Sequence, residues 1–342
     1  MQHMRWHARP GHRIVTAAAW LVAAVATGLA PAPAGADTPA APSTDEAAWL
    51  AGLQQRVIAD LAAGRPLVIQ VHVPLCDSSI IRCGGHGLGD GDDPERNLYW
   101  ATSEGFLGWF GRSDRRRGRN PAWRLVLDGD GATVGLPDVL DVRVWRRAVP
   151  ASAAWRAAGA PAQVPVFVVA YAWRGTAIDA GLAAYARDLY GDRARPLRLA
   201  DGTTIATGGA AQLVAYVGHN RLMDLAGYDW ARAGGGADVS TTGPRKGTIA
   251  IACHTAAYMK HDVPAPRRVP LVMTADFLMA SAPTLDGAVT AFAAGGDYRA
   301  IRRGAAQGYA DGSGKPLGRV QGAFTNPSDR RWRKEPAGEK TK

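Results

Sequence analysis

The chain has 342 residues, of which 47% are hydrophobic and 20% are charged, and its formal net charge is +10. After residue 36 no segment is apolar for long enough to cross a bilayer, which excludes a protein with several membrane spans. The basic clusters at 115–119 and 330–334 are typical of solvated faces or tails, so we expect no nucleic-acid partner.

The first 36 residues have the pattern of an export signal. Arg5, Arg9 and Arg13 precede an apolar stretch from Ile14 to Ala30, and small residues at 34–36 provide a cleavage site. An uncleaved anchor is the alternative, because this stretch is at the short limit for a membrane span. We therefore expect a periplasmic or secreted protein with no stable membrane span after cleavage.

The segments that follow alternate between strand and helix patterns. A Pro/Ala linker at 37–42 leads into a single predicted domain at 43–328, which has a loop-rich insertion at 75–120 and precedes a disordered basic tail at 329–342. Strands are expected at 67–73, 123–127, 141–149, 164–173, 212–218, 248–252 and 269–274, and helices at 43–63, 99–110, 176–190, 285–294 and 300–309, with a hairpin edge at 199–207. This alternation predicts an α/β fold with a mostly parallel sheet and helices on both faces.

Three cysteines in an exported chain predict one disulfide and one free thiol. Cys76 and Cys83 lie close together in a Gly-rich loop and are the natural pair, which leaves Cys253 free. Two other roles for Cys76 stay open: a free thiol at the edge of a site, or a metal ligand with His72, Cys83 and His86. Those four residues do not have regular zinc-finger spacing, so we expect no zinc and no other cofactor.

Acidic residues in the same insertion allow one further metal hypothesis. Asp90, Asp92 and Asp93 follow a Gly-rich run and could hold calcium, but the run lacks the length and the final glutamate of an EF-hand loop. A surface loop is the favoured interpretation.

Two buried strands end in reactive side chains. The apolar run 212–218 leads into His219, and the run 248–252 leads into Cys253. Chemistry collects at the carboxyl ends of parallel strands, so an imidazole and a thiol could meet there as a catalytic pair. Asp224 could orient the imidazole or could simply stabilise a first helical turn. Without a partner, Cys253 would be interpreted as an inert buried thiol.

Two neighbouring residues complete the predicted rim. Asp77, like Cys76, follows the strand 67–73 and should lie at the same edge as His219. His254 should face away from Cys253, because side chains alternate along a strand. We therefore do not expect His254 to be the base.

The pair resembles the caspase-like cysteine peptidases, the group of caspase, gingipain and clostripain. In that three-layer fold one buried strand ends in His-Gly and the next ends in Ala-Cys. Ala252-Cys253 matches this pattern, whereas Asn220 stands where the family has the glycine whose N–H helps to form the oxyanion hole. The resemblance implies attack by the Cys253 thiolate on a carbonyl carbon, proton donation by His219 and oxyanion stabilisation by the Cys253 N–H.

A second resemblance covers most of the chain after residue 36. The stretches 73–77, 97–100, 216–224 and 305–309 are similar to an uncharacterised family of exported bacterial proteins, in which the histidine segment more usually reads His-Asp-Gly-Leu-Met-Asp. Asn220 and Arg221 depart from that segment. This resemblance implies a shared site but names no substrate.

Together these patterns predict an exported cysteine hydrolase, a caspase-like peptidase or amidase. Its catalytic residues would be His219 and Cys253, with Asn220, Asp224, Cys76 and Asp77 in supporting or substrate-binding roles. The expected partner is a peptide or amide substrate, which could be associated with the cell envelope. The alternative is a non-catalytic envelope binding protein that keeps the same fold.

Overall fold

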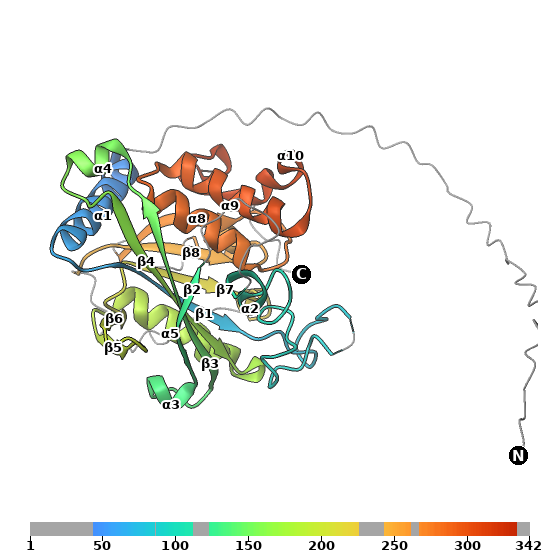
Figure 1. Cartoon of the computed structure of the whole chain (residues 1–342). Helices are drawn as coiled ribbons and strands as arrows, with labels where there is room; N and C mark the ends of the chain where they lie inside the picture. Colours follow the sequence, from blue (N-terminus) through green and yellow to red (C-terminus); the bar gives the residue numbers. More distant parts are fainter. Residues whose placement is uncertain (1–43, 86, 112–122, 226–242, 261–266, 334–342) are drawn as a thin grey trace, which may run out of the picture. The chain divides into compact units, whose positions relative to one another are not determined.

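An eight-stranded mixed sheet is the centre of the computed structural model, and five of its strands are parallel (Figure 1). The strands lie in the order β10 (Phe324–Thr325), β9 (Arg268–Thr274), β8 (Lys246–Ile251), β7 (Leu213–Val217), β1 (Leu67–Pro74), β4 (Gln163–Trp173), β3 (Val139–Pro150) and β2 (Arg124–Gly129). β9, β8, β7, β1 and β4 form the parallel part, while β10 at one edge and β3 and β2 at the other are antiparallel. This confirms the predicted α/β class with a mostly parallel sheet.

The structure describes residues 44–85, 87–111, 123–225, 243–260 and 267–333. The predicted signal at 1–36, the linker at 37–42, His86, the basic cluster at 115–119 and the end of the predicted tail, 334–342, lie outside these residues. Within them, no helix combines the length and the apolarity needed to cross a membrane.

The central strands are mostly apolar because both of their faces are buried. In β7, Leu213, Ala215 and Val217 belong to one core cluster. Val214 and Tyr216 point to the other face and pack in a second cluster. The alternation of side chains along a strand therefore divides one apolar sequence between two cores.

Helices cover both faces of the sheet (Figure 1). α1 (Thr44–Ala62), α8 (Ala282–Ala293) and α9 (Tyr298–Ser313) cover one face, and α5 (Ile178–Tyr190) covers the other. The remaining elements are α2 (Phe106–Phe110), α3 (Gly131–Val134), α4 (Ala153–Ala157), α7 (Thr255–Tyr258), α10 (Leu317–Val320), the hairpin β5 (Ala194–Arg198) and β6 (Thr204–Gly208), and the 3-10 turns η1 (Gly175–Ala177), η2 (Arg221–Met223), η5 (Gln321–Ala323) and η6 (Arg330–Arg333).

Helices α8 and α9 approach so closely that glycine is required at their crossing. A Cβ atom added at Gly287 would lie 2.0 Å from the carbonyl oxygen of Gly304. A Cβ at Gly308 would lie 2.0 Å from the carbonyl oxygen of Pro283. These contacts hold α9 against the sheet layer and position its carboxyl end beside the loops that follow the strands.

Two predicted segments differ from the structure. The helix expected at 99–110 is limited to α2, because the Asn97 side chain organises the preceding residues as turns: its Oδ1 accepts from the N–H groups of Cys76 and Tyr99, at 3.0 and 3.1 Å. The tail predicted as disordered from residue 329 is wrong over 329–333. There Trp332 is buried, and its Nε1 donates to Glu46 Oε1 at 2.6 Å.

The central strand β1 carries a buried histidine, His72. His72 has no exposed surface; its Nε2 pairs with Asp188 Oδ2 at 3.0 Å and its Nδ1 accepts from Trp173 Nε1 at 3.2 Å. Burial lowers the pKa of His72, and the hydrogen bond to Asp188 opposes this effect without overcoming it. The folded protein therefore favours neutral His72.

We predict that this histidine makes the protein less stable in mild acid. In the unfolded chain the imidazole takes up a proton near pH 6.5, whereas the folded state resists it, so the unfolding free energy falls as the pH drops below about 6.5. The slope from one such group is at most about 1.4 kcal/mol per pH unit. Urea titrations at several pH values should show a smaller slope for His72→Gln than for wild type. Equal slopes for His72→Gln and wild type would contradict the prediction.

Candidate functional site

Paired strand ends place His219 and Cys253 at the same level of the sheet. β7 and β8 are adjacent and parallel, and Val217 is the register partner of Ile251. The ladder extends one step further, because the Gly218 N–H donates to the Ile251 carbonyl at 3.1 Å. His219 and Cys253 each follow two residues after these partners, so both leave the sheet together at its carboxyl edge.

Asn220 ties the two loops to each other. It is fully buried, its Nδ2 donates to the Cys253 carbonyl at 2.6 Å, and its Oδ1 accepts from the Leu222 N–H at 3.2 Å. One side chain thus satisfies a backbone group in each loop. Asn220 therefore positions the loop beside Cys253. It is also the residue that differs from the caspase-like pattern and from the usual sequence of the uncharacterised family.

Asp224 holds the imidazole of His219. Its Oδ2 lies 2.7 Å from His219 Nε2, and the histidine side chain is 15% exposed. Arg221 pairs with the same carboxylate at 3.4 Å and with Asp179 at 2.8 Å. If Nε2 carries the proton donated to Asp224, the neutral ring presents Nδ1 as an acceptor, which is the form a general base needs. Geometrically, Asp224 is therefore placed to orient the ring.

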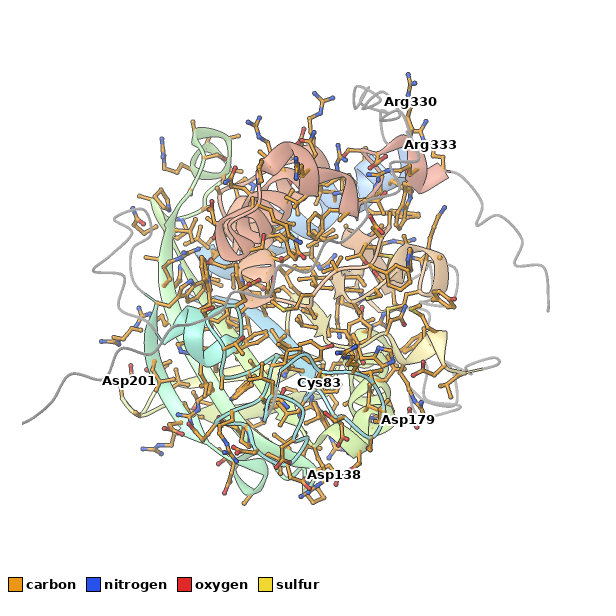
Figure 2. All side chains as sticks on the ribbon, turned by 90° about the vertical axis from the view of Figure 1, so that its right-hand side faces the viewer. Cys83, Asp138, Asp179, Asp201, Arg330 and Arg333 are labelled. Carbon is orange, nitrogen blue, oxygen red and sulfur yellow. A yellow bond between two sulfur atoms is a disulfide. The ribbon has the colours of Figure 1, made fainter. Side chains whose placement is uncertain are left out.

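Asp179, the acid that holds Arg221, comes from the first turn of α5. Figure 2 looks from the right-hand side of Figure 1 and shows Cys83 near the middle of the view and Asp179 to its lower right. Asp179 is thus contributed by the helix layer opposite α1, α8 and α9. The histidine loop is connected to that layer through Arg221 and through Leu222, which packs in the same core cluster as α5.

Cys253 is half-buried and is the free cysteine of the chain. Its Sγ lies 3.5 Å from the Leu278 carbonyl oxygen. Within the described residues the sulfur and the His219 ring do not hydrogen-bond to each other, since each has a different partner. Catalytic hydrogen bonds are often long before substrate binds and shorten in the complex.

A strained turn follows the cysteine directly. His254 has φ = 51°, in the left-handed region that non-glycine residues rarely adopt, and it begins the short helix α7. Buried threonines hold this turn: the Thr255 N–H donates to Thr274 Oγ1 at 3.0 Å, and Thr255 Oγ1 donates to the Ala250 carbonyl at 2.9 Å. Strain of this kind persists where the surroundings fix the backbone and is frequent at functional sites.

The His254 ring packs away from the imidazole of His219. It stands edge-on against Phe277, with ring centroids 4.4 Å apart. Its backbone N–H donates to the Asp276 carbonyl at 3.2 Å. His254 therefore connects the cysteine turn to the loop after β9.

Cys76 and Asp77 lie at the carboxyl end of β1, but their side chains bond to other residues of the insertion at 75–120. Cys76 forms a disulfide with Cys83 and is buried, so the alternatives of a free thiol and of a metal ligand at Cys76 are wrong. Asp77 Oδ1 accepts from the Ser79 N–H at 2.8 Å and from Ser79 Oγ at 2.6 Å, which caps its own turn. In the described part of the chain, no three His, Cys, Asp or Glu residues are grouped as a metal site would require.

Tyr99 belongs to the neighbourhood of Cys253, and the sequence analysis did not assign it to the site. Burial raises the pKa of Tyr99, and its electrostatic interaction with Cys253 acts in the same direction. The phenol therefore stays neutral and can donate a hydrogen bond. Its position in the resembled stretch 97–100 is the signal that could have identified it.

A pocket of about 360 Å³ opens next to the cysteine turn. Asp276, Phe277 and Leu278, the residues that contact Cys253 and His254, form one wall. Segments from α9, α10 and η5 form the rest. The sequence analysis placed no site residue in these segments, although Tyr309 lies in the resembled stretch 305–309.

Comparisons with protein-family models, with curated proteins and with solved structures find no match for this chain.

We predict that Asn220→Ala lowers the unfolding free energy by about 1–3 kcal/mol, because it removes the buried side chain that donates to the Cys253 carbonyl. Denaturant titration measures this loss. Asn220→Asp should also destabilise, since it keeps the acceptor for the Leu222 N–H but removes the donor to Cys253. Wild-type stability in both variants would show that the side chain does not join the two loops.

Proposed function

We propose that this protein is an exported cysteine hydrolase that cleaves a peptide or amide bond, with Cys253 as nucleophile and His219 as general base and acid. The supporting observation is the in-register exit of both residues from β7 and β8, held by Asn220 and with Asp224 on the imidazole. The resemblance to caspase-like peptidases, where histidine and cysteine also end neighbouring strands, supports the same assignment.

In this mechanism His219 Nδ1 takes the proton of the Cys253 thiol, and Asp224 stabilises the resulting imidazolium at Nε2. The thiolate attacks the carbonyl carbon and forms a tetrahedral intermediate whose oxyanion accepts from the Cys253 N–H. His219 then returns the proton to the leaving nitrogen, which breaks the C–N bond and leaves a thioester. Water, activated by His219, hydrolyses the thioester and restores the thiol.

Export is part of the proposal. The signal pattern at 1–36 supports it, and so does the Cys76–Cys83 disulfide, because disulfides persist in oxidising compartments. A cysteine nucleophile there has to remain unpaired, which the odd number of cysteines allows.

A non-catalytic envelope binding protein is the second candidate. One observation favours it: in the structure the thiol is engaged by the Leu278 carbonyl and the imidazole by Asp224, so the two groups have separate partners. A binding protein could use the same cleft without activating the sulfur.

Alkylation of Cys253 separates the two candidates. We predict that iodoacetamide modifies Cys253 near neutral pH at least about tenfold faster than an unperturbed thiol, and that His219→Ala removes this advantage, since a paired imidazole favours the thiolate. Rates are followed by intact-protein mass spectrometry. The control Arg303→Ala, which changes an exposed residue of α9 outside the cysteine turn, should label at the wild-type rate. Equal rates in wild type and His219→Ala would eliminate the dyad and favour the binding protein.

Hydrolysis itself is tested with a mixture of peptides analysed by mass spectrometry. We predict cleavage by the wild-type protein, none by Cys253→Ala, and a loss of at least about a hundredfold for His219→Ala, the range that general acid–base catalysis contributes. Cleavage that survives in Cys253→Ala would remove the proposed nucleophile.

A further inference from the structure

We infer that the pocket beside Cys253 selects the substrate and accepts an apolar group that carries a carboxylate. This inference deepens the proposed function and rests on it for the position of the reacting bond. Its physical basis is the combination of an apolar floor, a cationic rim and direct contact with the cysteine turn.

The contact with the cysteine turn puts the pocket within reach of a bound substrate. The Leu278 carbonyl lies 3.5 Å from Cys253 Sγ, and Phe277 packs against the ring that follows the cysteine. Both residues also line the pocket. A group attached close to the carbonyl that Cys253 attacks would therefore reach this cavity first.

The floor is apolar. Leu278, Tyr309, Val320 and Ala323 line it, and Tyr309 and Val320 are almost fully buried. The Phe277 ring at the rim is 69% exposed, which leaves a large apolar surface uncovered at the pocket. A ring or an aliphatic chain that entered would bury this surface together with the floor, and apolar burial stabilises binding.

The rim carries an excess of positive charge. Lys315 and Arg319 are both exposed and line the pocket, and among the described residues neither forms a salt bridge within 4.0 Å. Asp276 is the acid of the lining, and its Oδ1 already accepts from the Phe277 N–H at 2.8 Å. Burial raises the pKa of Glu104 and the positive charge of Lys315 opposes this effect, but Glu104 does not line the pocket. A carboxylate is thus the complementary ligand for two cations that form no salt bridge within the described residues.

The chain geometry fixes the two cations on one side. Gly314, with φ = 68°, ends α9 in the left-handed conformation, and Pro316 then starts α10. Lys315 lies within this turn and Arg319 lies on α10, one helical turn beyond Pro316. Both charges therefore face the same opening from a short rigid segment.

Two matched alkylating reagents test the inference: para-iodoacetamidobenzoate, which is anionic, and para-iodoacetamidobenzamide, which is neutral and of the same shape. The readout is the ratio of their rates at Cys253, divided by the same ratio for glutathione. We expect the wild-type protein to prefer the anion about fivefold, the gain from one or two exposed ion pairs. Lys315→Met combined with Arg319→Met should bring the ratio to about one, and Arg303→Met, which removes an exposed arginine of α9 outside the pocket, should leave it at the wild-type value.

The ratio separates this inference from the proposed function. If Cys253 is not activated, both reagents react slowly, but their ratio still reports the pocket. A normalised ratio near one in the wild type would overturn the pocket assignment. A fall of the ratio in Arg303→Met as large as in the double variant would also overturn it, because the preference would then come from the overall positive charge of the chain.

Discussion

The in-register pairing of β7 with β8 is the constraint on which the candidate site depends. Each strand is buried on both faces. A shift of the register by one residue would therefore move the side chains that pack in one core to the other core. The register therefore fixes where each strand leaves the sheet. His219 and Cys253 are placed by packing of the residues before them, far more than by contacts of their own.

Beyond the strands, buried polar side chains define the loops by satisfying backbone groups. Asn220 donates to the Cys253 carbonyl, and Asn97 makes a similar double contact with the backbone N–H and carbonyl of Cys76, at 3.0 and 2.8 Å. Thr255 does the same for the turn after β8. The loops after β1, β7 and β8 are thus each held by a polar side chain that satisfies backbone groups. The free thiol of Cys253 therefore lies at an edge whose loops are held by buried polar side chains.

Much of the fold could be predicted from the sequence, because long apolar runs and turn residues carry strong local signals. The strands that became β1, β4, β7 and β8 were predicted within one or two residues at most of their ends. The helix at 99–110 was wrong because Asn97 forms long-range bonds to Cys76 that no local pattern reveals. The same reason explains the segment 329–333, whose burial depends on Glu46 at the other end of the chain.

The site was predictable only where it coincides with strand ends. His219, Cys253 and Asp224 lie next to strong periodic signals, and the structure places all three at one edge of the sheet. Asp77 and Cys76 share the end of β1 but are turned toward their own loop by Ser79 and Cys83. The pocket residues Lys315 and Arg319 could not be identified, since their meeting with Leu278 requires α9 to cross α8 at the glycines.

The buried Trp332 has a consequence for the order of events in the cell. Its ring packs in the same cluster as Met259, just after the turn that holds Cys253, and Lys260 contacts both its carbonyl and its ring. A ribosome makes the chain from its amino end, so this support appears only after the cysteine turn itself has been made. The thiol turn therefore acquires its full packing late, and a chain interrupted before residue 332 would carry the cysteine on an incompletely supported loop.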